Sequence, residues 1–301
     1  MAGICDGRVV IVTGAGRGLG RAHALAFARE GAKVVVNDLG VAADGSGEDR
    51  TPAQQVVDEI RAAGGEAVTD ASDVADFEQA ARLVAAALEA FGRLDVVVNN
   101  AGFVRDRMFV SCSEEEWDAV VRVHLRGHFC VSRRACDHWR AESKAGRAVD
   151  ARIVNTSSGA GLQGSVGQSA YAAAKAGIAA LTLVQAAELA RYGITANAIA
   201  PSARTRMTEG PFADMMRKPE HGFDAMDPAN VSPLVVWLGS AESREVTGQV
   251  FEVAGGAISV ADGWRTGPRV DKGARFAPDE VGAAVRDLLA KAVPAQKVYG
   301  A

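Results

Sequence analysis

The order of apolar and polar positions along the chain alternates between two kinds of pattern. Short apolar runs rich in β-branched residues lie at residues 8–13, 33–37, 66–69, 94–98, 152–156, 195–199 and 249–253. Longer stretches with apolar residues at helical spacing lie at residues 19–30, 51–63, 76–91, 114–139, 168–191 and 228–238. Strands that alternate with helices predict an α/β fold, a parallel sheet joined by helical crossovers. The all-apolar run at 94–98 favours a sheet covered on both faces.

Three further stretches have a different composition. Residues 40–49 are rich in Gly, Asp and Ser, which predicts a surface loop, and residues 201–222 follow a strand, where α/β enzymes place mobile substrate loops. From Ala254 onward the chain is Gly-rich, and residues 278–292 predict one more helix with Val281, Val285, Leu288 and Leu289 on one face. No stretch has the composition of a linker, so we expect one domain over residues 1–301.

Composition and charge exclude several classes of protein. With 48% hydrophobic and 23% charged residues the chain is an ordinary globular one, and 37 acidic against 33 basic residues leave no basic block for nucleic acid or an anionic membrane. The 4 Cys are scattered without a CxxC, so we expect no metal or redox site and a reducing compartment, the cytoplasm. No run approaches the roughly 20 apolar residues of a membrane span, and no export signal is expected.

The first predicted strand ends in a glycine-rich turn that leads into a helix. Its sequence is Thr13-Gly14-Ala15-Gly16-Arg17-Gly18-Leu19-Gly20, which matches Thr-Gly-x-x-x-Gly-x-Gly and not the common GxGxxG. Glycines let a backbone approach a pyrophosphate, and a helix N-terminus supplies N–H groups and a favourable dipole. A tight turn without a ligand is the alternative, and this motif alone does not decide between them.

An acidic residue at the end of the second predicted strand bears on the choice of ligand. Asp38 follows Gly20 by 18 residues, where a carboxylate can accept hydrogen bonds from the adenosine ribose hydroxyls of NAD. The same carboxylate would repel the 2'-phosphate of NADP. Arg17 in the turn favours the opposite choice, because a basic side chain there can reach a 2'-phosphate. We weigh Asp38 more heavily and expect NAD.

A third pattern joins a serine, a tyrosine and a lysine. Ser158 is followed after 12 residues by Tyr171 and then by Lys175, and Tyr and Lys at positions i and i+4 share one face of a helix. Tyrosine exchanges protons poorly near neutrality because its reference pKa is about 10. We expect a neighbouring ammonium and a nicotinamide cation to lower that pKa by roughly 2 to 3 units. Each residue alone is unremarkable; their joint occurrence with the glycine turn indicates a dehydrogenase site.

On these motifs the sequence resembles the short-chain dehydrogenase/reductase family from about residue 7 to residue 256. Asp73-Val74 after the third strand and Asn99-Asn100-Ala101-Gly102 after the fourth fall in the family's order with the turn and the serine, tyrosine and lysine. The resemblance implies a Rossmann-type, doubly wound parallel sheet of about seven strands with helices on both faces. Residues 257–301 would then form a C-terminal extension.

The resemblance also implies roles for the site residues. Tyr171 would be the acid/base, Lys175 would bind the nicotinamide ribose, and Ser158 would hold the substrate oxygen. Asp73 would contact adenine, and Asn99 would lie along the cofactor. The further cofactor-binding residues implied are Gly14, Arg17, Gly18, Leu19, Gly20, Asp38, Val74, Ala101, Gly102, Pro201, Thr205 and Thr208.

The sequence departs from the family pattern in three places. His124 occupies the position where members often carry a catalytic Asn, which makes it a candidate catalytic residue and questions the usual proton relay; its backbone carbonyl could still bind a water leading to Lys175. Ser202 follows Pro201 in place of the usual Gly, and either Thr205 or Thr208 would contact the nicotinamide amide. Ala254 stands where an Asp often precedes paired glycines.

These departures resemble one subgroup, the dehydrogenase domain of the peroxisomal multifunctional enzyme type 2. The shared stretches are residues 36–40, 105–107, 123–127, 200–201 and 206–208. The resemblance implies oxidation of (3R)-hydroxyacyl-CoA thioesters with NAD, and of some steroids. Arg105, Arg107, Arg204 and Arg206 would then bind the phosphates of CoA; the alternative is that they are solvated loop charges.

The sequence therefore predicts an NAD-dependent dehydrogenase of a secondary alcohol, most simply the 3-hydroxyl of an acyl-CoA or of a steroid-side-chain CoA thioester. A free hydroxysteroid or another bulky alcohol is the alternative substrate. A nucleotide-binding sensor without turnover is the alternative from another class. The helix at 168–191 carries more apolar surface than one buried stripe requires, so we expect a homodimer or homotetramer.

Overall fold

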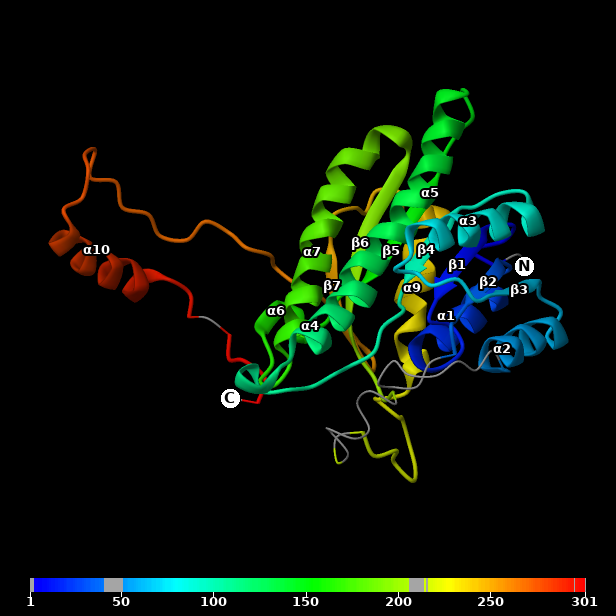
Figure 1. The fold of residues 1–301 in the computed structure, drawn as a ribbon, viewed down its shortest axis with the longest axis horizontal. Helices are drawn as coiled ribbons and strands as arrows, with labels where there is room; N and C mark the ends of the chain where they lie inside the picture. Colours follow the sequence, from blue (N-terminus) through cyan, green and yellow to red (C-terminus); the bar gives the residue numbers. More distant parts are fainter. Residues whose placement is uncertain (1–2, 41–50, 206–213, 215, 295, 301) are drawn as a thin grey trace.

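The computed structural model describes residues 3–40, 51–205, 214, 216–294 and 296–300. In these residues eight strands form one sheet in the order β3-β2-β1-β4-β5-β6-β7-β8 (Figure 1). The strands are β1 (Val9–Thr13), β2 (Lys33–Asn37), β3 (Ala67–Asp70), β4 (Val96–Asn99), β5 (Ala151–Thr156), β6 (Ile194–Ser202), β7 (Val250–Ala254) and β8 (Ala257–Val260). All pair in parallel except β8, which is antiparallel to β7.

Helices cover both faces of the sheet, as the doubly wound fold class predicts. One buried apolar cluster joins one sheet face to α1 (Gly18–Arg29), α2 (Thr51–Ala62) and α9 (Ser232–Gly239). A second joins the other face to α3 (Phe77–Phe91), α5 (Gly127–Lys144) and α7 (Ser169–Leu189). The α/β prediction is confirmed. The order of the strands reverses between β1 and β4, and ligands of such sheets bind at that point, beyond the carboxyl ends of the strands.

Two elements add detail to the sequence predictions. The sheet has eight strands where about seven were expected, because Gly255 and Gly256 form a two-residue hairpin that turns the chain back as β8; Gly255 has φ +54°, a conformation that suits glycine. The single helix expected over 114–139 is three segments, α4 (Glu114–Val121), a π-helical turn (Arg122–Arg126) and α5. The wider π turn places His124 in the interior, and such turns are frequent at functional sites.

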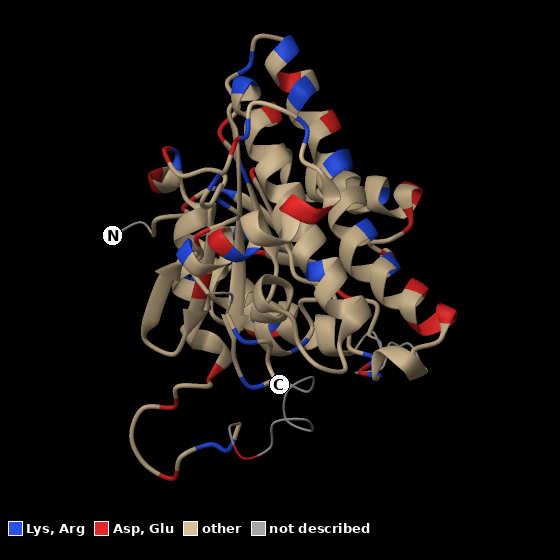
Figure 2. Cartoon of the chain, turned by 90° about the vertical axis from the view of Figure 1, so that its left-hand side faces the viewer, with Lys and Arg blue, Asp and Glu red and all other residues tan. Residues whose placement is uncertain are grey.

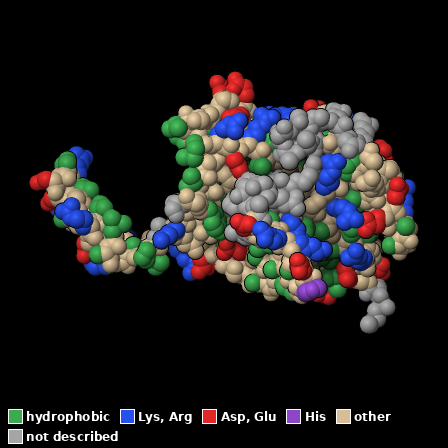
Figure 3. All heavy atoms as spheres, turned by 90° about the horizontal axis from the view of Figure 1, so that it is seen from below, with side chains coloured by type: hydrophobic (Ala, Val, Ile, Leu, Met, Phe, Trp, Pro, Cys, Tyr) green, Lys and Arg blue, Asp and Glu red, His purple; other side chains and the backbone are tan. Residues whose placement is uncertain are grey.

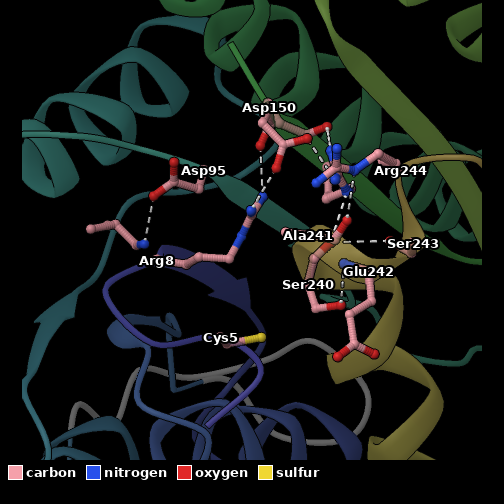
Figure 4. Close-up of polar contacts among 12 residues, drawn as sticks. Cys5, Arg8, Asp95, Asp150, Ser240, Ala241, Glu242, Ser243 and Arg244 are labelled. Atoms are coloured by element: carbon pink, nitrogen blue, oxygen red, sulfur yellow. Dashed lines mark hydrogen bonds and ion pairs between the residues drawn. The ribbon is translucent and has the colours of Figure 1, made fainter. Parts of the chain in front are cut away.

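The amino ends of β1 and β5 are held together by partly buried ion pairs (Figure 4). Asp150 precedes β5 and pairs with Arg8 at 2.9 Å and with Arg152 at 2.7 Å, and Arg152 is almost completely buried. Although burial raises it, the pKa of Asp150 is held below its ordinary value by the hydrogen bonds from the two guanidinium groups. These charges lie at the end of the sheet opposite the glycine turn, so their role is structural.

The helix α7 was not expected to be a membrane span, yet one stretch that contains it, Ser169–Tyr192, is long and apolar enough by composition to cross a bilayer. Its surroundings identify it as a core helix. It packs on the sheet, and its Thr182 and Gln185 side chains accept hydrogen bonds from Asn155 Nδ2 on β5 at 2.9 and 2.8 Å. The packing of α7 and its polar partners against the sheet therefore explains its apolar composition.

The chain leaves the body of the molecule after β8. The arm, residues 261–294, carries α10 (Pro278–Lys291) away from the body, and residues 298–300 lie beside α6 (Gly159–Gln163) (Figures 1 and 3). The predicted helix at 278–292 is present, and Val281, Val285 and Leu289 on it are exposed. On the side drawn in Figure 2, charges of both signs are interspersed along the helices, consistent with the absence of a basic block.

Candidate active site

The glycine turn is fastened to the end of β4. Thr13 Oγ1 accepts the N–H groups of Asn100 at 2.9 Å and Ala101 at 3.1 Å, and Asn100 Nδ2 donates to the Thr13 carbonyl at 3.0 Å. Gly14 has φ +62°, and a Cβ there would lie 2.7 Å from Ala101 Cα. A Cβ on Gly20 would lie 2.2 Å from the Gly14 carbonyl oxygen. The close approach of strand, turn and helix therefore requires glycine at both positions.

The start of α1 and the Asp38 carboxylate face the same turn. Arg17 is the N-cap of α1, but its side chain makes no capping hydrogen bond, which leaves the first-turn N–H groups of the helix without that cap. Asp38 accepts the Gly16 N–H at 2.7 Å and the Gly40 N–H at 2.6 Å. The arrangement suits a dinucleotide, with the pyrophosphate at the helix N-terminus and the adenosine ribose near Asp38.

The loop after β6 lies across from the turn. Thr205 Cγ2 would be 3.6 Å from a Cβ on Gly18, and Pro201, the next-to-last residue of β6, pairs with Val253 of β7. Thr208 and Arg206, also predicted at this edge, lie outside the described residues. Of the two threonines, the structure therefore places Thr205 near the glycine turn; its contact with a nicotinamide stays a prediction.

Ser158, Tyr171 and Lys175 come together at the carboxyl end of β5. Ser158 is the N-cap of α6 and accepts the Ala160 N–H at 3.2 Å, while Tyr171 and Lys175 lie on α7. The Ser158 side chain lies close enough to the Tyr171 hydroxyl to act on its pKa. Lys175 Nζ lies 5.5 Å from the centroid of the Tyr171 ring and donates to the Thr156 carbonyl at 2.6 Å. The three side chains predicted to act together thus form one cluster.

Burial dominates the electrostatics of this cluster. It raises the pKa of Tyr171 above its ordinary value; Ser158 opposes this, and the Asp106 carboxylate adds to it. Burial lowers the pKa of Lys175 to about 7. The sequence prediction of a lowered tyrosine pKa concerns the site with a nicotinamide cation bound, so it stays a prediction.

His124 is fully buried against Tyr171. Its Nε2 lies 2.6 Å from the Phe103 carbonyl oxygen, and its ring meets the Tyr171 ring edge-on at a centroid distance of 5.2 Å. Burial, assisted by the charge of Lys175, lowers the pKa of His124 to about 3, so the ring is neutral. The side chain therefore packs the tyrosine; its catalytic role, by ring or by carbonyl, stays a prediction.

His128 is a site residue that the sequence prediction missed. Its Nε2 accepts the Thr156 N–H at 3.3 Å, next to the carbonyl that holds Lys175, and the backbone of His124 and of Asn99 lies near enough to act on its pKa. Burial places its pKa well below the ordinary value. The only available signal was its spacing, one helical turn after His124, which by itself does not distinguish a core histidine.

Three residues assigned to the cofactor have other contacts. Asp73 Oδ2 pairs with Arg122 at 2.6 Å, and its Oδ1 accepts the Ala75 N–H at 2.9 Å. The Val74 side chain is packed in the core, and so is that of Asn99, whose Nδ2 donates to Ser132 Oγ at 2.8 Å and Asn155 Oδ1 at 2.9 Å. The neighbouring Asn100 braces the turn, and the predicted contacts of Asp73, Val74 and Asn99 with the cofactor stay predictions.

The comparisons with known proteins agree with this geometry. A family profile described as short chain dehydrogenase matches residues 8–215. A crystal structure of a short chain dehydrogenase from Mycobacterium avium is 66% identical and superposes with a TM-score of 0.90, covering 99% of this chain and 100% of that one. The chain belongs to the short-chain dehydrogenase family, whose members typically use a nicotinamide cofactor.

Two relatives narrow the class of reaction. The hydroxyacyl-CoA dehydrogenase ChsB1 of Mycobacterium tuberculosis is 47% identical over 97% of this chain and 91% of its own length. The peroxisomal multifunctional enzyme type 2 of Mus musculus is 49% identical over 84% of this chain, which spans 32% of that enzyme. The resemblance to this subgroup is confirmed, and the protein is an oxidoreductase that acts on CH–OH groups.

Proposed function

We propose that the protein is an NAD-dependent dehydrogenase that oxidises the 3-hydroxyl of a (3R)-hydroxyacyl-CoA or of a steroid-side-chain CoA thioester. The observation that carries this proposal is the cluster of Ser158, Tyr171 and Lys175 at the end of β5, on the same edge of the sheet as the glycine turn. The relative from Mycobacterium tuberculosis is named a hydroxyacyl-CoA dehydrogenase, which supports the thioester substrate.

In this mechanism each side chain has one task. Ser158 holds the substrate hydroxyl, Tyr171 takes its proton, and Lys175 provides a positive charge beside the phenolate. The nicotinamide accepts the hydride when bound. Because burial raises the pKa of Tyr171, the proton transfer depends on positive charge brought into the site, and His124 and Phe103 exclude water from one side of the ring.

Two alternatives predict different outcomes in one assay. The purified protein is incubated with NAD and a panel of (3R)-hydroxyacyl-CoAs, hydroxysteroids and simple secondary alcohols, and NADH absorbance is followed. We expect the acyl-CoAs to be oxidised fastest. Turnover of free steroids alone would favour the alternative substrate, and binding of NAD with no turnover of any alcohol would favour the sensor.

We propose NAD as the cofactor because Asp38 lies at the glycine turn. Asp38→Ala is expected to lower the ratio of kcat/KM with NAD to kcat/KM with NADP by about tenfold or more, since it removes a ribose acceptor and a like-charge barrier. Steady-state kinetics with both cofactors measure the ratio. Asp58→Ala, an exposed position on α2, is the control. A preference of the unmodified protein for NADP would reject the assignment and favour Arg17.

We also propose a homodimer or homotetramer. Leu183 and Val184 on α7 are 52% and 51% exposed, an apolar face that the part of the chain described in the structure leaves uncovered. Light scattering at micromolar concentration should show two or four chains, and Leu183→Glu should shift the population toward the monomer, whereas Ile4→Glu, near the start of the chain, should not. A monomeric unmodified protein would refute this assembly.

The cytoplasm is the compartment we propose. All 4 cysteines are free thiols, and Cys5 and Cys130 are buried in the core. Free thiols persist in a reducing compartment.

A further inference from the structure

Residues 298–300 pair with the segment that joins two catalytic side chains. The Tyr299 N–H donates to the Gly164 carbonyl at 3.2 Å, and the Val166 N–H donates to the Tyr299 carbonyl at 2.9 Å, so that Ser165 and Tyr299 form a short parallel bridge. The Tyr299 hydroxyl accepts a hydrogen bond from Gln163 Nε2 at 3.0 Å. We call residues 159–168, which follow Ser158 and precede the helix with Tyr171, the wall segment.

The other edge of the wall segment is also held. The Arg107 N–H donates to the Gly167 carbonyl at 2.7 Å, and Gln168 Nε2 donates to Asp106 Oδ1 at 3.0 Å. Asp106 is the carboxylate that acts on the pKa of Tyr171. The wall segment is therefore braced from one side by the loop after β4 and from the other by residues that lie about 130 positions further along the chain.

The contact reaches the residue next to Ser158. A Cβ on Gly159 would lie only 2.8 Å from the Tyr299 hydroxyl oxygen, so the tyrosine ring end takes the space that a side chain would fill. Apolar side chains gather along this brace. Those exposed to solvent are Met108, Phe109 and Val110, which directly follow Arg107, together with Val166, Val298 and Tyr299.

We propose that residues 298–300 complete the substrate site, with Tyr299 as a positioning and specificity residue that fixes the wall segment for a bulky apolar group of the substrate. The inference rests on the proposed function. The wall segment begins directly after Ser158, so the part of a substrate that extends from the reacting carbon passes it. An exposed apolar surface beside such a site favours a long acyl chain or a sterol ring system over a short polar alcohol.

Two variants and two readouts test this role. Tyr299→Ala removes the ring, and Tyr299→Phe removes only the hydroxyl that Gln163 contacts. We expect Tyr299→Ala to raise KM for a long-chain (3R)-hydroxyacyl-CoA by about fivefold or more, with kcat on a four-carbon acyl-CoA within about twofold of normal, because Tyr171 and Lys175 stay on α7. Tyr299→Phe should raise the same KM about threefold or less.

Hydrogen exchange of the Val166 amide measures how firmly residues 298–300 hold the wall segment, and it requires no substrate. Tyr299→Ala should speed that exchange by about tenfold, since the acceptor is no longer held in place. Leu289→Ala on the exposed face of α10 is the matched control for Tyr299→Ala, and Tyr192→Phe is the control for Tyr299→Phe; neither should change either readout.

The possible results distinguish a failure of the brace from a failure of its role in specificity. Unchanged Val166 exchange in Tyr299→Ala would overturn the brace, and faster exchange with an unchanged KM for the long-chain substrate would overturn its role in specificity. If the unmodified protein oxidised no acyl-CoA, steroid or other alcohol, the proposed function would fail and the specificity role with it, while the exchange result would still decide the brace.

Discussion

Tyr171→Phe is expected to lower kcat by about two to four orders of magnitude while the affinity for NAD stays near normal. The substitution removes one hydroxyl group, which lies beside Ser158 and is the only proton acceptor that the proposed mechanism uses. The phenyl ring keeps its edge-on packing with His124, so the fold around it is conserved. Steady-state kinetics and NAD binding measured by fluorescence titration separate the two effects.

The pH dependence of the unmodified enzyme follows from the same residue. Alcohol oxidation requires an ionised Tyr171, and burial holds the pKa of that hydroxyl above its ordinary value in the protein alone. The oxidation rate should therefore rise with pH, and Tyr171→Phe should remove that rise. Tyr192→Phe, at a partly buried tyrosine roughly 30 Å further along the same helical segment, is the control and should leave the profile unchanged.

The variant Lys175→Ala distinguishes the role of the lysine from that of the tyrosine. Lys175 is buried beside the ring, and its proposed contacts include both Tyr171 and the cofactor ribose, so this variant should lower kcat and weaken NAD binding together.

Near-normal turnover of Tyr171→Phe would assign the proton transfer to another group, with His124 as the first candidate because it is the titratable ring packed against the tyrosine.

The parts of this site that the sequence predicts best are those set by local chemistry. Turn 13–20 is identified by its glycines because backbone conformation and close approach demand them at Gly14 and Gly20. The spacing of Tyr171 and Lys175 is fixed by the helix that carries them. Contacts of this kind depend on short stretches of chain, and a reader of the sequence can derive them without knowing the tertiary structure.

The parts that the sequence does not predict depend on which way a side chain faces. Asn99 and Asn100 are adjacent in sequence and identical in type, yet the Asn99 side chain is buried at the end of β4 and the Asn100 side chain braces the turn. His128 and Tyr299 reach the site through backbone atoms of Thr156 and Gly164, and no side-chain pattern signals such contacts. The π-helical turn at 122–126 is too short to produce a recognisable repeat of apolar and polar residues, so the sequence does not predict it.

The arginines proposed to bind CoA also differ in which way their side chains face. Arg204 pairs with Asp224 and also donates to the Met216 carbonyl at 2.9 Å. Its side chain is only 16% exposed, so its guanidinium group is held by these contacts within the loop. Arg206 lies outside the described residues. Arg105 stacks over Phe103, and Arg107 pairs with Glu116 at 3.0 Å while remaining 58% exposed. The loop after β4 therefore presents the remaining candidates.

A (3R)-hydroxyacyl-CoA should be oxidised with a kcat/KM at least about 100-fold higher than that of the matching free 3-hydroxy acid. Two charge-assisted hydrogen bonds to phosphate, from Arg105 and Arg107, contribute about 1.5 to 3 kcal/mol each, and remote binding energy of this kind assists turnover at the β-carbon. Because these bonds lie near the surface, raising the salt concentration should reduce the advantage of the thioester.

The measurement compares kcat/KM for thioester and free acid at low and high salt in the unmodified protein and in two variants. Arg107→Ala should lower kcat/KM for the thioester and leave that for the free acid unchanged, because only the thioester carries phosphates. Arg217→Ala, at a side chain 79% exposed in the loop after β6, is the matched control. Equal efficiency on both substrates, or activity on uncharged steroids alone, would reject the CoA substrate and leave the dehydrogenase itself intact, since Ser158, Tyr171 and Lys175 serve any secondary alcohol.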